Sequence, residues 1–345
     1  FHISFLASIL VGIYALFQLA GAFDIHQGSV RLDATLGNAT YLAVYMLFHL
    51  FLALYYFLKT KNAYAQISYA ILFIFQTFIL FQTATRGAVI GFIGGMFLFA
   101  VLFAFLANER RWRYIAIGIL GVIVLAAGVF YSAKDSQFVK ESPALSRLSN
   151  ISIQDDDAQA RLHIWKMSYE AFLERPILGW GPENFTVVFS KYFDPRLWAR
   201  EPWFDRAHNV FFDWLIAGGI LGLAAYLGIF ASAFYLLIRK YIERKISNLE
   251  LSVFAGLLGG FFFQNLFVFD QLTSYIMFFA VIGYINFISR AAGEAQKSVS
   301  LIPSGQAQVF SMVPIVLVLV ALYFFNVKPL LANFSLINAL ENANK

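Results

Sequence analysis

Long apolar runs separated by short polar turns make up most of the chain. Because about 20 apolar residues cross the hydrocarbon core of a bilayer, a nearly uncharged run of about 18 or more predicts a transmembrane helix. About nine such spans are predicted, near residues 2–22, 39–58, 64–83, 86–106, 114–131, 210–238, 250–270, 272–289 and 309–327. The pattern therefore predicts an all-α fold, a polytopic transmembrane helix bundle that forms a single integral membrane domain over residues 1–345.

One polar segment, residues 132–207, forms a loop of about 75 residues between two apolar runs. Apolar residues recur within it at helical spacing, at Ala158, Leu162, Trp165, Tyr169 and Phe172. Asp156 and Gln159 have the spacing of a capping box, and Pro176 is expected to end the helix. We therefore predict an amphipathic helix in the loop, on the membrane face or at the outer mouth of the bundle.

The composition agrees with a membrane location, since 60% of the residues are hydrophobic and 13% are charged, against about 25% charged in soluble domains. The absence of cysteine excludes disulfides, thiolate nucleophiles and cysteine-based metal sites. Residues 1–23 lack a basic leader and a cleavage site, so we expect a span rather than a signal peptide there. We also expect the native chain to be longer at its N-terminus, and residues 330–345 to form a short C-terminal tail that begins as a helix.

Basic residues orient the bundle, because short cytoplasmic loops are enriched in Lys and Arg. One side carries eleven basic residues, Lys59, Lys61, Arg110, Arg111, Arg113, Arg239, Lys240, Arg244, Lys245, Arg290 and Lys297. The same side carries four acidic residues, Glu109, Glu243, Glu250 and Glu294, for a net charge of +7. The 132–207 loop is therefore predicted to be extracytoplasmic, on a multi-pass protein of the inner (cytoplasmic) membrane. The basic pI of 9.2 reflects this topology and gives no support for nucleic-acid binding.

Arg86 opens one predicted span, and Gly87, Gly91 and Gly95 follow at every fourth residue. Small residues at this spacing let two helix backbones approach closely, which would fix Arg86 at the outer interface. The alternative is an arginine that extends to the lipid headgroups.

Arg161 lies in the first turn of the amphipathic helix, one turn before Trp165. The dipole at a helix N-terminus favours anions, so an arginine there is more natural if it binds one; the alternative is a solvated surface arginine. The run Asp155–Asp157 has the chemistry of a divalent-cation site, but a helix cap in a solvated turn is favoured, and no metal site is predicted.

The segment 179–185 (GWGPENF) has the glycines of a tight loop, and Glu183 is its carboxylate best suited to chemistry; an ordered turn without a ligand is the alternative. His208 and Asn209 lie where the loop re-enters the membrane. Histidine can take and return a proton near neutral pH, although it can equally act as an interfacial hydrogen-bonding residue. Arg206 is either a third cation or a charge at the rim, and Asp270 either orients a functional side chain or marks the end of a span.

Arginines, a histidine and ordered loops thus gather on one side of the bilayer. Arginine binds phosphate oxygens bidentately and stays charged. Such a set fits group transfer from a lipid-linked pyrophosphate, in which arginines stabilise the leaving diphosphate and a base deprotonates a hydroxyl.

The order of these segments resembles the O-antigen ligase and O-antigen polymerase superfamily of bacterial membrane glycosyltransferases. The matching motifs are Arg31…Gly37-Asn38, Thr85-Arg86-Gly87, Arg161-x-x-x-Trp165, Pro176-x-x-Gly179-x-Gly181-x-x-x-Phe185, and His208-Asn209 with Gly218, Gly219 and Gly222. The resemblance implies metal-independent, inverting transfer of a glycan from undecaprenyl pyrophosphate to a lipid, glycan or protein hydroxyl, without a cofactor. It also implies that Arg86 and Arg161 bind the pyrophosphate and that His208 is the base or positions the acceptor. We extend the predicted substrate site to Trp165, Glu183, Arg206 and Asn209.

A ligase is the leading interpretation, and a polymerase or a protein O-oligosaccharyltransferase would use the same donor chemistry. The alternative from a different class is a polysaccharide transporter or flippase without chemistry. Transporters tend to place charged sites near the middle of the membrane, whereas the charges here lie at span ends, which favours an enzyme.

Overall fold

The computed structural model describes residues 1–26, 30–149, 154, 156–198, 203–290, 316–317 and 320–343, and over these residues the regular structure is helical. The chain divides into two compact units, Phe1–Arg290 and Ala291–Lys345. The second unit includes the π-helical turn η3 (Tyr323–Val327) and α14 (Lys328–Ala343), so the described residues of the predicted tail are helical, and the tail itself stays a prediction.

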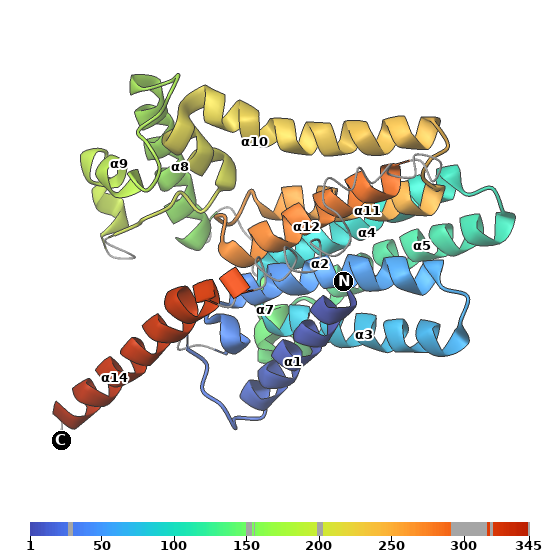
Figure 1. Ribbon diagram of the computed structural model, residues 1–345, viewed down its shortest axis with the longest axis horizontal. Helices are drawn as coiled ribbons and strands as arrows, with labels where there is room; N and C mark the ends of the chain where they lie inside the picture. The colour runs from blue at the N-terminus through green and yellow to red at the C-terminus, as the bar shows by residue number, and fades with distance from the viewer. Residues whose placement is uncertain are drawn as a thin grey trace. The chain divides into compact units, whose positions relative to one another are not determined.

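The first unit is a helix bundle with additional helices at one end (Figure 1). Its long helices are α1 (His2–Leu19), α2 (Ala39–Lys59), α3 (Ala63–Gln82), α4 (Arg86–Leu106), α5 (Arg110–Ala133), α10 (Val210–Ile242), α11 (Asn248–Gln264) and α12 (Leu272–Ser289). Between them lie η1 (Ala34–Leu36), α6 (Gln137–Glu141), α7 (Pro143–Ser149), α8 (Asp156–Glu174), α9 (Phe185–Lys191) and η2 (Pro195–Leu197).

Six of these helices are long and apolar enough to cross a membrane, namely α1 to α5 and α10. Residues 272–288 of α12 form a shorter apolar helix, and α11 has 17 residues because it ends before the polar turn that begins at Asn265. Part of the ninth predicted span, including residues 309–315, lies outside the described residues. A count of nine spans therefore stays a prediction, while the all-helical fold with several candidate spans is confirmed.

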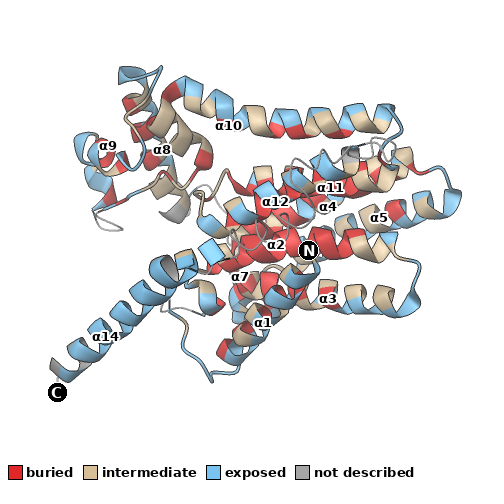
Figure 2. Ribbon diagram, viewed as in Figure 1, coloured by how far each residue is buried: buried red, intermediate tan, exposed pale blue. Residues whose placement is uncertain are grey.

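Helix α2 forms the centre of the bundle and is buried along most of its length (Figure 2). Its sequence is apolar on every side, which is typical of a helix surrounded by other helices. Asn38 begins the helix, since its side chain accepts a hydrogen bond from the backbone N–H of Thr40 at 2.8 Å. Helices α1, α3, α4, α11 and α12 contact α2, and together they form the apolar core.

Helices α4 and α11 touch through glycines. A Cβ atom added to Gly95 would lie 2.5 Å from the carbonyl oxygen of Gly256, and one added to Gly91 would lie 2.7 Å from that of Gly260. The contact is reciprocal, because Cβ atoms on Gly256 and Gly260 would lie 2.7 and 2.6 Å from the carbonyl oxygens of Gly95 and Gly91. The close helix approach predicted from the glycine spacing is confirmed, and α11 is the partner.

The 132–207 loop folds into helices with a small core of their own. Helix α8 is the predicted amphipathic helix and ends just before Pro176, as expected. Its buried face consists of Ile164, Met167, Ser168 and Ala171. This core also takes up residues from α9, η2, residues 204–207 and the start of α10.

The apolar stripe predicted for α8 is not the face buried in this small core, since Leu162 and Tyr169 are 43% and 52% exposed; its place on the membrane face or at the outer mouth stays a prediction. The reason is that α9 and the start of α10 cover the adjacent face, and helical periodicity alone cannot show which face a tertiary partner will cover.

The glycine contact yields a matched test. We expect Gly95→Ala to lower the free energy of unfolding by about 2 kcal/mol, because the added methyl group would overpack the contact with α11. Gly94→Ala, one position earlier on the same helix, is the control, since a Cβ atom there meets nothing within 4 Å. Thermal unfolding in detergent would show a lower midpoint for Gly95→Ala alone; equal midpoints for the two variants would contradict the backbone contact.

Candidate active site

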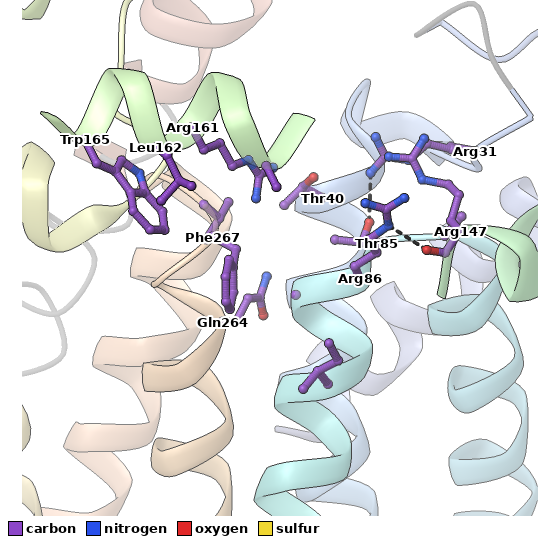
Figure 3. A pocket seen from close by; sticks show the side chains of 15 residues that line it. Arg31, Thr40, Thr85, Arg86, Arg147, Arg161, Leu162, Trp165, Gln264 and Phe267 are labelled. Atoms are coloured by element: carbon purple, nitrogen blue, oxygen red, sulfur yellow. Dashed lines mark hydrogen bonds between the residues drawn. The ribbon is translucent and has the colours of Figure 1, made fainter. Parts of the chain in front are cut away.

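A cavity of about 370 Å³ opens at the loop-side ends of α4 and α11, and α8 forms one of its walls (Figure 3). Four arginines line it: Arg31, Arg86, Arg147 and Arg161. They come from the segment before α2, the first residue of α4, the short helix α7 and the first turns of α8. Segments far apart in the sequence therefore converge to give one strongly cationic cavity.

Two contacts fix the position of Arg86. Its backbone opens α4, which the glycines fix against α11, and its Nε donates a hydrogen bond to the carbonyl oxygen of Arg147 at 2.6 Å. Arg31 completes this group, since its Nε donates to the carbonyl oxygen of Thr83 at 3.1 Å and its Nη2 donates to Oγ1 of Thr85 at 3.0 Å. Three arginines are thus gathered by hydrogen bonds to fixed backbone and hydroxyl groups.

Arg161 and Trp165 approach the cavity from α8. The indole Nε1 of Trp165 donates to the carbonyl oxygen of Ala207 at 3.1 Å, and its ring stacks on Phe212 with the centroids 5.9 Å apart. Trp165 therefore connects the wall of the arginine cavity to the residue immediately before His208.

His208 lies at the turn into α10 with a φ of 54°, a left-handed conformation that strains a non-glycine residue. Its ring packs edge-on against Phe204 and Phe269, with centroids 5.6 and 5.2 Å away. The Nδ1 atom lies 3.3 Å from the carbonyl oxygen of Arg206. When Nδ1 carries the proton and donates to this oxygen, Nε2 keeps a free lone pair, as a general base requires.

Burial lowers the pKa of His208 below its ordinary value of 6.5. The positive charge of Arg161 lowers the pKa further, while the Arg206 carbonyl and Asp205 oppose the shift. The imidazole is therefore neutral at physiological pH and available to accept a proton.

A second cavity of about 220 Å³ lies beside this turn, and Glu183, Arg206 and Asp270 are among its lining residues. The Nη2 of Arg206 donates to both carboxylate oxygens of Glu183 at 2.8 Å. Asp270 accepts hydrogen bonds from Trp214 Nε1 at 3.2 Å and from the Tyr275 hydroxyl at 2.9 Å, and burial raises its pKa. The structure thus places Arg86, Arg161 and Trp165 at one cavity and Glu183 and Arg206 at another.

Asn209 is buried, and its side-chain oxygen accepts hydrogen bonds from the backbone N–H groups of Phe211 at 2.9 Å and Phe212 at 3.4 Å. These contacts make Asn209 the N-cap of α10. A role in binding substrate stays a prediction.

The predicted tight loop docks into a break in α10. Gly219 has φ 61° and ψ −156° and interrupts the helix. The carbonyl oxygen of Pro176 accepts from Ile220 N at 2.8 Å, and Trp180 N donates to the carbonyl oxygen of Ile216 at 2.6 Å. Cβ atoms on Gly179 and Gly219 would lie 2.4 Å from the carbonyl oxygen of Ile216 and 2.3 Å from that of Ile177. Both glycines therefore allow a backbone-to-backbone joint that positions Glu183 and the start of α10.

Sequence reasoning missed Arg147 and Gln264, which line the arginine cavity. Arg147 is one of many charged residues in the loop, and no local pattern distinguishes it. Gln264 carried a usable signal, because a polar side chain within an apolar span often has a functional role. Arg31 belonged to a motif but had no assigned role, and Asp155 of the predicted acidic run lies outside the described residues.

The joint between the loop and α10 gives a second matched test. We expect Gly219→Ala to destabilise the protein by about 2 kcal/mol, because a side chain there is strained and would meet the backbone of Ile177. Gly218→Ala is the control, since its Cβ atom would meet nothing within 4 Å. Limited digestion with the glutamate-specific protease Glu-C would show faster cleavage after the exposed Glu183 in Gly219→Ala only; identical digestion of both variants would contradict a docked loop.

Residues 70–227 match the sequence model of the family described as O-Antigen ligase. The matched region includes Arg86, Arg161 and His208, as well as the loop that docks into α10, whereas Arg31 and Gln264 lie outside it. No match was found among curated proteins. The chain therefore contains an O-antigen ligase family domain over residues 70–227, within a protein that has several candidate membrane spans.

Proposed function

We propose that this protein is a membrane glycosyltransferase that transfers a glycan from an undecaprenyl-pyrophosphate donor to a hydroxyl acceptor on the outer face of the cytoplasmic membrane. The family implies glycan transfer of the O-antigen ligase or polymerase type from lipid-linked substrates. The observation that carries the proposal is the convergence of four arginines on one cavity at the loop-side ends of α4 and α11.

The chemistry of this cavity suits a lipid diphosphate. Its arginines offer forked N–H donors that match phosphate oxygens, and the N-terminus of α4 adds the positive end of a helix dipole. Ile90, Leu162 and Phe267 line the same cavity and offer apolar contacts to the first isoprene units of the lipid. A ligand that is anionic at one point and apolar beside it therefore fits.

In the proposed reaction, Arg86 and Arg161 hold the diphosphate and stabilise the negative charge that grows on it as it leaves. His208 accepts the proton of the acceptor hydroxyl through Nε2, and the hydroxyl oxygen attacks the anomeric carbon. The new glycosidic C–O bond forms as the bond between the anomeric carbon and the phosphate oxygen breaks. Attack opposite the leaving group inverts the anomeric centre, and the four arginines supply the positive charge that the leaving group needs without a metal.

The second cavity is the proposed route for the acceptor. His208 lines neither cavity, but Phe269 lines the second one and contacts the His208 ring, so we place the acceptor hydroxyl on the His208 side of Phe269. The paired Glu183 and Arg206 offer an acceptor and donors to a sugar or peptide. Asn209 holds the turn that carries His208, and Trp165 lies at the donor cavity. A ligase, a polymerase and a protein O-oligosaccharyltransferase would all use the donor cavity in the same way and would differ in what enters the second.

The test is glycan transfer in reconstituted membranes. The donor is a glycan linked to undecaprenyl pyrophosphate, and each variant is compared at an equal amount of folded protein. We expect His208→Ala to lower the transfer rate by about 10²–10⁴-fold, the usual contribution of a general base, while donor binding is kept. His163→Ala is the matched control, because this histidine of α8 pairs with Asp194 at 3.4 Å and has no role in the proposed reaction. If the parent is active and His208→Ala transfers glycan at the same rate, His208 is not the general base.

The pH dependence gives an independent test. Because the pKa of His208 is lowered, we expect kcat/KM to decline on the acidic side with a midpoint below pH 6.5. Arg161→Gln removes a positive charge that lowers this pKa, so the decline should move up toward 6.5, whatever the loss in rate. A decline centred above 6.5 in the parent, or an unshifted profile in Arg161→Gln, would contradict this assignment.

The lowered pKa of His208 also makes the free energy of unfolding depend on pH. Between the lowered pKa and 6.5 the unfolded chain binds a proton at His208 that the folded protein does not, so the free energy of unfolding falls as the pH drops through this window.

A further inference from the structure

Gln264, the last residue of α11, lines the arginine cavity and is only 1% exposed. Neither of its side-chain polar atoms, Nε2 or Oε1, has a hydrogen-bond partner within the described part of the chain. An amide that is buried without hydrogen-bond partners loses its bonds to water and gains none in the protein, which lowers the stability of the fold. A buried, unpartnered amide on the wall of a cavity therefore points to a ligand group that completes it.

The position of Gln264 is fixed by the same contact that fixes Arg86. A Cβ atom on Gly91 would lie 3.4 Å from the Cβ of Gln264, one turn into α4 from Arg86. The carbonyl oxygen of Gln264 accepts a hydrogen bond from Phe267 N at 2.9 Å, which holds the turn that follows. The amide is therefore presented by a rigid element.

The chemistry of an amide narrows what the ligand group can be. Phosphate oxygens at neutral pH only accept hydrogen bonds, so a diphosphate would satisfy Nε2 and leave Oε1 without a donor. A sugar hydroxyl or an acetamido group both donates and accepts, so it satisfies both atoms. The arginines already provide the donors that the diphosphate needs.

The cavity also separates its charged and aromatic groups. Figure 3 shows Arg31, Arg86 and Arg147 together on one side, and Trp165, Leu162, Phe267 and Gln264 on the other, with Arg161 between. Aromatic faces pack against the C–H groups of sugar rings. The indole Nε1 of Trp165 donates a hydrogen bond to the carbonyl oxygen of Ala207, the residue before His208. The aromatic side of the cavity is therefore the one connected to the proposed base.

We propose that the Gln264 side of this cavity is a subsite for the first sugar of the donor, with the arginine side reserved for the diphosphate. Gln264 binds a group of that sugar that both donates and accepts a hydrogen bond, and Trp165 and Phe267 pack against the ring. The anomeric carbon then lies between the two sides of the cavity. This inference rests on the proposed donor, but concerns which part of the donor each side of the cavity recognises.

The test compares two lipids bound to the full chain in detergent: undecaprenyl pyrophosphate, and undecaprenyl pyrophosphate bearing one N-acetylglucosamine, whose acetamido group both donates and accepts. The parent should bind the sugar-bearing lipid more tightly. Gln264→Leu should weaken binding of that lipid by about tenfold, the usual size of one or two hydrogen bonds, and leave the sugar-free lipid unchanged. Arg86→Ala should weaken both.

Thermal unfolding separates a binding role from a structural one. Replacing an unpartnered buried amide by an apolar group of similar size should leave the unfolding temperature unchanged or raise it. Gln76→Leu is the matched control, since Gln76 is also buried, on α3, and its Nε2 donates to Ser8 Oγ at 2.8 Å, away from the cavity lining. This control should lower the unfolding temperature and leave the binding of both lipids unchanged.

Each contrary outcome has a distinct meaning. If the parent binds neither lipid, the proposed donor is wrong, and the subsite falls with it. If the parent binds both lipids equally, or Gln264→Leu weakens neither, the donor assignment survives and the sugar subsite is refuted. If Gln264→Leu weakens both lipids equally, Gln264 contacts the diphosphate, and the division of the cavity is overturned.

Discussion

The backbone contact between α4 and α11 is the constraint on which the site depends. Lipid is as apolar as the helices, so two membrane helices gain little from hiding apolar surface and associate by close packing. Gly91, Gly95, Gly256 and Gly260 provide it, because without side chains of their own they let the two backbones touch. The contact fixes the start of α4 and the end of α11 relative to each other, and these two points carry Arg86 and Gln264.

The broken helix α10 applies a similar principle to the loop. A break within an apolar helix leaves backbone N–H and C=O groups without partners, which is costly in a membrane unless another backbone supplies them. The segment from Pro176 to Gly181 does so by bonding to residues on both sides of Gly219. The loop is thereby joined to α10, which begins at Val210 just after His208, and the small core around α8 and α9 is anchored beside the arginine cavity.

The α4–α11 contact and the docking of the loop into α10 together determine where the charged side chains of the site lie. Four arginines line one cavity, and backbone carbonyls and a hydroxyl accept hydrogen bonds from Arg31 and Arg86. A bound dianion would add favourable contacts to these arginines, so the free energy of ligand binding and the stability of the cavity are linked. His208 is neutral because burial and the nearby positive charge of Arg161 both oppose its protonation and so lower its pKa.

The sequence by itself determined the all-helical class, most span positions, the amphipathic helix before Pro176, and the close helix approach at Gly91 and Gly95. These features follow from local periodicity, and from spacing along a single helix. Only the tertiary structure decided that α11 is the partner of α4, which face of α8 is buried, and that Arg31, Arg147 and Gln264 join Arg86 and Arg161 at one cavity. It also placed Glu183 and Arg206 at a second cavity and gave Asn209 a capping contact. The physical reason is that periodicity reports the shape of one helix, whereas convergence depends on long-range contacts between helices, which no local pattern encodes.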